Sequence, residues 1–195
     1  RHLVVFAKEP VMGRVKTRLS RDIGIVAATR FYRRTLSTVM RRLGPDPRWH
    51  SWLAISPDSA AVKSMFWPAA FQAFMQGPGD IGHRMARAMM RMPPGPVVII
   101  GTDVPAIRPD HIEAAFRTLG HHDAVLGPAA DGGYWLIGAR RTPRIPEMFS
   151  GVRWSCEHTL TDTLGKLEKN DVKLARLETL EDIDNGHSYR RWLSK

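Results

Sequence analysis

The amino-acid sequence predicts an α/β protein built on a mostly parallel sheet. Short apolar runs alternate with longer amphipathic stretches along the 195 residues, which is typical of βαβ units. Val97–Ile100 is an unbroken run of β-branched residues, as in a strand that is buried on both faces. No internal repeat, low-complexity tract or linker interrupts the pattern. A chain of this length is expected to form a single domain, 1–195, around one sizeable core.

The first half of the chain predicts three strands and three helices. Leu3–Ala7 is the first strand, and a polar loop separates it from a helix over Ile25–Leu43. Apolar residues recur at helical spacing in that helix, and Gly44 followed by proline ends it. The other expected elements are strands Ser51–Ile55 and Phe71–Met75, a short helix from Pro57 to about Phe66, and a helix over Gly82–Met92.

The second half begins with the buried strand Val97–Ile100. Pro109 is suited to a first helical position and predicts a helix to about Leu119. The apolar runs Ala124–Gly127 and Tyr134–Gly138 flank a turn-rich segment and predict a small mixed part of the sheet. The last expected elements are a helix over Ser155–Glu168, a strand over Val172–Leu177 and a short helix over Ser188–Leu193.

Charge and composition limit the possible partners. The net charge of +10 suggests an anionic ligand, but the basic residues form neither a tail nor a stripe interleaved with aromatics, which argues against nucleic acid. The single cysteine, Cys156, excludes an internal disulfide and fits a reducing compartment. No apolar run approaches the roughly 20 residues of a membrane span, and the amino-terminal run is too short for a signal peptide. We therefore expect no membrane span and a cytoplasmic location.

A basic loop follows the first expected strand. Ligands of open parallel sheets bind outside the carboxyl ends of the strands, and this loop leaves such an end. It carries four cations and a permissive glycine, which together suit a polyphosphate. Its spacing matches neither a Walker loop nor a dinucleotide fingerprint. The alternative is a solvated basic turn. The residues concerned are Lys8, Gly13, Arg14, Lys16 and Arg18.

Two acidic positions suggest a divalent metal. Asp103 lies at the exit of the buried strand, within the run Gly-Thr-Asp-Val-Pro at 101–105. Asp184 follows the last expected strand and could complete a metal shell begun by Asp103, as could Asp182, which alternation would place on the same side. Carboxylate oxygens at such a place suit Mg²⁺ or Mn²⁺, which neutralises phosphate charge. Ordinary turn or capping roles for both aspartates are the alternative.

Two glycine-containing segments are further candidates. The segment 79–82 enters a helix, and there Asp80 and Gly82 could admit a base or ribose, or Asp80 could simply cap the helix. The segment 131–134 could contact an acceptor or sugar, although Asp-Gly-Gly is also a common hairpin turn. The residues of that second segment are Asp131, Gly132, Gly133 and Tyr134.

Together, four motifs resemble a bacterial glycosyltransferase-like family in the nucleotide-diphospho-sugar transferase (GT-A) superfamily. They are Phe-Ala-Lys-x-Pro-x-x-Gly-x-Val-Lys-Thr-Arg-Leu at 6–19, Gly-Asp-x-Gly-x-Arg-Met at 79–85, Gly-Thr-Asp-x-Pro at 101–105 and Asp-Gly-Gly-Tyr-x-Leu-Ile-Gly at 131–138. The resemblance implies a three-layer α/β/α, Rossmann-like GT-A fold, a divalent metal and a nucleotide or nucleotide-sugar substrate. The chain departs from the family at Cys156, where threonine is usual, and in the turn after Asp184.

The resemblance leaves three functional hypotheses. In glycosyl transfer, a metal at Asp103 holds the diphosphate of a sugar nucleotide, and Asp131 positions or deprotonates the acceptor. In nucleotidyl transfer, the metal, Lys16 and Arg18 hold a nucleoside triphosphate, and an acceptor phosphate displaces pyrophosphate. The run 16–19 resembles the phosphate loop of nucleotidyltransferases. The third hypothesis is a catalytically silent nucleotide-binding domain. No residue pattern identifies the base, sugar, acceptor or oligomeric state.

Overall fold

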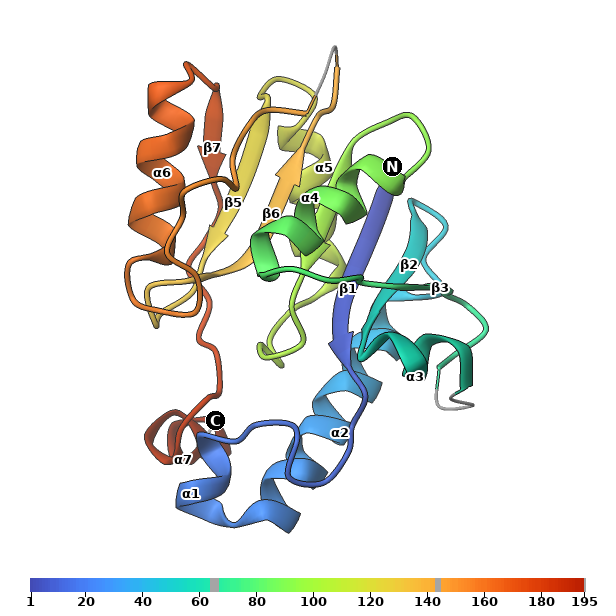
Figure 1. Ribbon diagram of the computed structural model, residues 1–195, viewed down its shortest axis with the longest axis vertical. Coiled ribbons are helices and arrows are strands. Elements are labelled where there is room, and N and C mark those ends of the chain that lie inside the picture. Colours follow the sequence, from blue (N-terminus) through green and yellow to red (C-terminus); the bar gives the residue numbers. More distant parts are fainter. Residues whose placement is uncertain (64–66, 143–144, 195) are drawn as a thin grey trace.

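The computed structural model describes residues 1–63, 67–142 and 145–194, and seven strands within them form one sheet (Figure 1). The strands are β1 (His2–Lys8), β2 (His50–Ser56), β3 (Gln72–Met75), β4 (Val97–Ile100), β5 (Ala124–Pro128), β6 (Tyr134–Ala139) and β7 (Leu174–Arg176). Their order across the sheet is β3-β2-β1-β4-β6-β5-β7. Strand β6 is antiparallel to β4 and β5, and the other pairs are parallel. The predicted mostly parallel sheet with a small mixed part is confirmed.

Helices cover both faces of the sheet. They are α1 (Leu19–Ile23), α2 (Ile25–Leu43), α3 (Asp58–Lys63), α4 (Ile81–Arg91), α5 (Pro109–Thr118), α6 (Thr159–Lys169) and α7 (Gly186–Leu193). The apolar sides of α2 and α5 share one core cluster, and those of α4 and α6 share a second cluster on the opposite face. Figure 1 shows α4 in front of the sheet and α5 behind it. The three-layer α/β/α prediction is confirmed.

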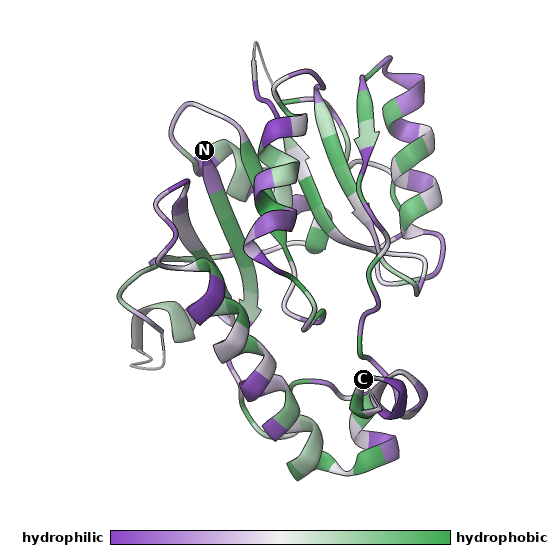
Figure 2. Ribbon diagram, turned by 180° about the vertical axis from the view of Figure 1, so that it is seen from behind, coloured by the Kyte–Doolittle hydropathy of each residue, from purple (hydrophilic) through white to green (hydrophobic). Residues whose placement is uncertain are grey.

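Side chains alternate between the two faces of the sheet along β1, so this one strand contributes to both core clusters. Leu3 and Val5 belong to the cluster under α2, while Val4 between them belongs to the cluster under α4. All three side chains are fully buried, as are Val97 and Val98 of β4. Figure 2 shows these central strands in the hydrophobic colour, flanked by helices of mixed colour. No helix among the described residues has the length and apolarity to cross a membrane.

Several predicted elements need correction, and one helix was not predicted. Helix α1 was not predicted, because five residues are too few to show a helical period. Helix α6 begins at Thr159 rather than Ser155, since Ser155 has a φ of 60° and interrupts helical geometry. Strand β7 is shorter at both ends than Val172–Leu177. The helix expected to reach Phe66 is helical to Lys63, and its last three residues lie outside the described ranges.

A small lobe lies beyond the carboxyl edge of the sheet (Figure 1). This α1–α7 lobe consists of α1, the first turns of α2, and α7, packed around the buried Leu19, Phe31 and Ile183. Asp22 of α1 accepts a hydrogen bond from the backbone N–H of Gly186 at 2.7 Å. The backbone N–H of Ile183 donates to the carbonyl of Asp103 at 3.0 Å, which ties the lobe to the end of β4.

Candidate functional site

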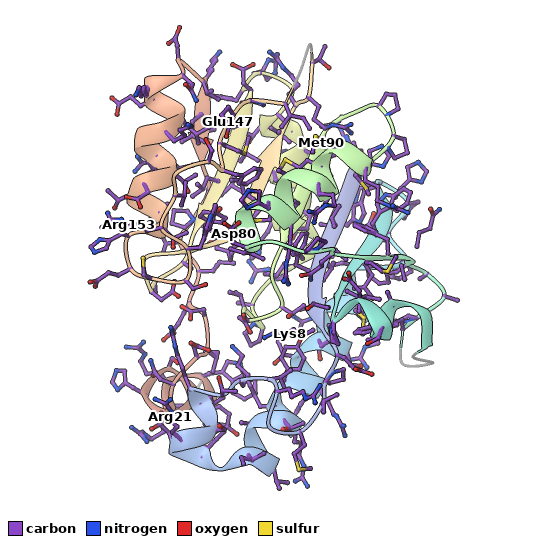
Figure 3. All side chains as sticks on the ribbon, in the orientation of Figure 1. Lys8, Arg21, Asp80, Met90, Glu147 and Arg153 are labelled. Carbon is purple, nitrogen blue, oxygen red and sulfur yellow. The ribbon has the colours of Figure 1, made fainter. Side chains whose placement is uncertain are left out.

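A cleft of about 1060 Å³ opens at the carboxyl edge of the sheet. Four neighbouring parallel strands end there, and residues at or directly after their last positions line the cleft. Ligands of open α/β sheets bind at this kind of edge, because the strand-to-helix loops diverge around it. Figure 3 shows Lys8 at this edge, whereas Met90 and Glu147 lie toward the opposite end of the sheet. The residues at the four strand ends are Lys8, Ser56, Gln76 and Gly101.

Lys16 lies at the centre of the predicted phosphate and metal residues. Its ammonium nitrogen is 2.6 Å from Oδ1 of Asp103 and 3.6 Å from Oδ1 of Asp184. The same nitrogen donates to the carbonyl oxygen of Ile183 at 2.6 Å. The Lys16 side chain is only 3% exposed, and its backbone has a φ of 49°. Two carboxylates and a carbonyl thus surround one buried cation.

The rest of the basic loop also faces the cleft. Arg18 pairs with Oδ2 of Asp184 at 3.2 Å, so Asp184 is shared between two cations. The side chains of Lys8 and Arg14 line the cleft, and no ion pair of either is found within the described parts of the chain. Gly13 has a φ of 76°, a backbone conformation that favours glycine, and a Cβ there would meet nothing within 4 Å. Gly13 therefore serves the turn of the loop, and no other part of the chain that the structure describes packs against it.

Tyr32 of α2 anchors the start of this loop. Its hydroxyl accepts from the backbone N–H of Lys8 at 2.9 Å and donates to the carbonyl of Lys8 at 3.0 Å. The Thr102 hydroxyl lies 3.4 Å from the same oxygen, in the turn that carries Asp103. Burial raises the pKa of Tyr32 to about 12. The protonated phenol therefore joins the loops after β1 and β4 at neutral pH.

The segment 79–82 caps a helix in the structure. Oδ1 of Asp80 accepts from the backbone N–H of His83 at 2.9 Å, and this hydrogen bond lowers the pKa of Asp80. A Cβ on Gly82 would lie 2.4 Å from the ring of Trp154, so this glycine makes room for that ring. Trp154 and Arg84 line the cleft, and sequence reasoning missed both as site residues. Arg84 is within the motif at 79–85, which could have identified it.

The segment 131–134 forms a wall of the cleft. Oδ1 of Asp131 accepts from the backbone N–H of Gly133 at 2.9 Å, in the expected turn. A Cβ on Gly132 would lie 2.4 Å from the carbonyl oxygen of Glu157, so Gly132 admits the segment leading into α6. The Tyr134 hydroxyl is buried beside Thr163 of α6 without hydrogen-bond geometry, and burial raises its pKa well above the usual value.

A smaller cavity of about 170 Å³ adjoins the cleft beside Asp103. Asp182 lines it together with Asp131 and Asp184. Burial, with the nearby charge of Asp131, raises the pKa of Asp182 to about 6. No cluster of three or more histidine, cysteine or acidic residues with metal-site geometry is found among the described residues.

The structure therefore brings most of the predicted site residues to one cleft. Those that line it are Lys8, Lys16, Arg18, Asp103, Asp131, Gly133, Tyr134 and Asp184. The other predicted residues support neighbouring segments and do not line the cleft: Gly13, Asp80, Gly82 and Gly132.

Residues 39–156 match a family model described as "Uncharacterized protein conserved in bacteria (DUF2064)". The chain belongs to this family. A candidate nucleotide-diphospho-sugar transferase from Desulfovibrio desulfuricans G20 is 30% identical and superimposes with a TM-score of 0.86, covering 94% of this chain and 82% of that one. No match to the sequence was found among curated proteins.

More distant solved structures share the fold. CMP:2-keto-3-deoxy-manno-octonic acid synthetase complexed with CTP is 13% identical, with a TM-score of 0.61 and coverage of 100% of this chain and 97% of that one. Rv0371c from Mycobacterium tuberculosis H37Rv, in complex with manganese, is 17% identical, with a TM-score of 0.58 and coverage of 100% and 97%. The DUF2064 chain thus has the GT-A and nucleotidyltransferase fold that its motifs predicted.

Proposed function

We propose that this DUF2064 protein is a metal-dependent transferase that acts on a nucleotide-activated substrate. The observation that carries the proposal is the cluster of Asp103, Asp184 and Lys16 at the carboxyl edge of the sheet. It combines acidic oxygens for a divalent ion with a cation for phosphate. The CTP complex and the manganese complex of two proteins with the same fold support it.

The donor set around Lys16 fits a divalent ion. Asp103 and Asp184 supply carboxylate oxygens and Ile183 supplies a carbonyl, and these are the hard oxygen donors that Mg²⁺ and Mn²⁺ prefer. The Lys16 ammonium stands among them as an internal cation. A bound ion would neutralise charge on the substrate phosphates. Lys16 and Arg18 would orient those phosphates through charge-assisted hydrogen bonds.

Glycosyl transfer from a nucleoside-diphosphate sugar is the leading form of the proposal. Asp131 lines the same cleft as Asp103, so it can position or deprotonate an acceptor hydroxyl while the diphosphate is held at Asp103. The structure from Desulfovibrio desulfuricans G20, described as a candidate nucleotide-diphospho-sugar transferase, supports this form.

Nucleotidyl transfer is the second candidate, and the charge of the basic loop favours it. Lys8 and Arg14 line the cleft without an ion-pair partner among the described residues. A nucleoside triphosphate with a phosphorylated acceptor brings more negative charge than a sugar nucleotide does, and it would use these cations.

A product assay separates the two reactions. The protein is incubated with Mg²⁺ or Mn²⁺ and a panel of nucleoside triphosphates, sugar nucleotides and acceptors. Release of a nucleoside diphosphate from a sugar nucleotide would support glycosyl transfer and contradict nucleotidyl transfer. Release of pyrophosphate that depends on a phosphorylated acceptor would support nucleotidyl transfer and contradict glycosyl transfer. Nucleotide binding without either product would leave a silent binding domain.

The metal assignment is tested by Asp103→Asn. We expect this variant to lose most metal-dependent nucleotide binding in calorimetry, because the amide removes the charge that attracts the ion. Asp110→Asn, at an exposed position on α5 away from the cleft, is the matched control and should bind as the wild type does. Unchanged binding by a folded Asp103→Asn protein would contradict the assignment.

A further inference from the structure

The ammonium group of Lys16 occupies the proposed metal site. The Lys16 ammonium lies between Oδ1 of Asp103 at 2.6 Å and Oδ1 of Asp184 at 3.6 Å. The carbonyl of Ile183 accepts its third contact at 2.6 Å. These are the same oxygens that would bind a divalent ion. Lys16 is therefore in a position to compete with that ion.

The geometry of the loop keeps Lys16 in this place. Its side chain is 3% exposed, and its carbonyl accepts a hydrogen bond from the backbone N–H of Ser20 in α1. Arg18 holds the other oxygen of Asp184 at 3.2 Å. A free divalent ion would have to enter beside two positive side chains or displace Lys16 from its carboxylates. Either route has an electrostatic cost in a partly buried site.

A nucleotide changes this balance. Its phosphate oxygens can accept hydrogen bonds from the Lys16 ammonium in place of the Asp103 and Asp184 carboxylates, and they add ligands for the ion. The cleft beside Lys16 is also lined by Lys8 and Arg14, so a phosphate there has further cations to meet. Phosphate and metal thus favour each other's binding, while metal alone meets competition.

We propose that Lys16 acts as a latch that closes the site to free divalent ions, so that the protein takes its nucleotide substrate together with the metal. Without a nucleotide, the ammonium occupies the oxygens of Asp103, Asp184 and Ile183. With one, the ammonium moves to phosphate and the carboxylates are released to the ion. This inference rests on the proposed nucleotide function.

The test is a titration with Mn²⁺ alone, in which electron paramagnetic resonance measures the free ion. Lys16→Met keeps the apolar stem of the side chain and removes the ammonium. We expect this variant to bind Mn²⁺ at least about tenfold more tightly than the wild type, because a neighbouring positive charge is gone. Adding Asp103→Asn to Lys16→Met should abolish the gain. Equal or weaker Mn²⁺ binding by folded Lys16→Met overturns the latch.

A second measurement uses only the wild-type protein and covers the case in which Lys16→Met does not fold. Acetic anhydride labels exposed lysines, and mass spectrometry quantifies the label on Lys16. We expect strong protection of Lys16 in the free protein and increased labelling when Mn²⁺ alone is raised until it occupies the site. Continued protection of Lys16 at Mn²⁺ saturation would show that ion and ammonium do not compete.

The two proposals fail in different ways. If no nucleotide in the panel raises Mn²⁺ binding by the wild type while the Lys16→Met gain persists, the proposed nucleotide function fails and Lys16 still blocks free ions. If nucleotides raise Mn²⁺ binding but Lys16→Met shows no gain, only the latch fails.

Discussion

Gly82 and Gly132 are the residues at which small size matters most for the cleft. Each lies where a Cβ would come within 2.4 Å of the segment that leads into α6, at the Trp154 ring and at the carbonyl of Glu157. The two glycines let this segment pack closely against α4 and the 131–134 turn, without lining the cleft themselves. The glycines of the motifs at 79–85 and 131–138 are therefore explained by this packing.

Gly82→Ala is expected to destabilise the protein by about 1–3 kcal/mol, because the Trp154 ring must move out of the way. Gly165→Ala is the matched control: it lies in α6, where an added methyl group would meet nothing within 4 Å, and alanine there should stabilise the helix by up to about 1 kcal/mol. Urea unfolding followed by tryptophan fluorescence measures both. Equal stability of the two variants would contradict the role of Gly82.

His111 predicts a pH dependence of stability. Its side chain is 6% exposed and contacts Glu178 at 3.0 Å, and burial lowers its pKa below the usual value. The folded state thus favours neutral His111, so its contribution to stability is full above about pH 6.5 and is lost as the pH falls. His111→Asn should lose less stability than the wild type between about pH 7.5 and pH 5.5 in urea unfolding. A parallel loss in both proteins would contradict this assignment.

At the scale of elements, α7 supports the site although none of its residues lines the cleft. Trp192 packs edge-on against Phe31 of α2, with ring centroids 5.2 Å apart, and also contacts Tyr189. This packing fixes the segment that carries Ile183 and Asp184, which in turn holds Lys16. The position of the phosphate loop therefore depends on the docking of a helix.

Trp192→Ala is expected to lower the free energy of unfolding by about 2 kcal/mol, which is less than the loss expected for a fully buried aromatic ring. It should weaken nucleotide binding as well. Trp52→Ala provides the control, because Trp52 is also half-buried but packs against His2 at the amino end of β1. Both variants should lower the free energy of unfolding, and only Trp192→Ala should raise the nucleotide Kd. If the two variants had similar nucleotide Kd values, the docking of α7 would not affect the site.

Most of the elements could be predicted from the sequence, and the reasons are local. Helix α2 spans Ile25–Leu43 as predicted, because its apolar side repeats over many turns and Gly44 ends it. Helix α1 has one turn and a boundary at Gly24, so it carries no periodic signal. The start of α6 depends on the turn at Ser155 and on tertiary contacts of Glu157 and Leu160 with Gly132.

The candidate site could be predicted only in part. The positions of Asp103 and Asp184 at strand exits suggested a shared location, and the structure places both beside one cleft. That Lys16 lies between them could not be predicted, because it depends on the path of the C-terminal segment around the α1–α7 lobe. The contribution of Trp154 was missed because its segment carries no recognisable ligand-binding pattern.

At the scale of the whole molecule, ligand binding should appear as a shift in stability. If metal and nucleotide bind together, each alone should change the Tm little, whereas both at about a hundred times the Kd should raise it by roughly 5–10 °C. Differential scanning fluorimetry with Mn²⁺, nucleotide and the two combined measures this. A full shift with Mn²⁺ alone would argue against the joint binding of metal and nucleotide.

The contact between Lys16 and Asp184 also has a consequence for how the protein is made. The two residues are separated by nearly the whole length of the chain. At ordinary rates of translation, roughly 10–30 s pass on the ribosome between the synthesis of one and of the other. The basic loop is synthesised first, and Lys16 cannot pair with Asp184 until that residue has been made. A nascent chain can therefore form its first strands early, but it completes this site only after Asp184 has been synthesised.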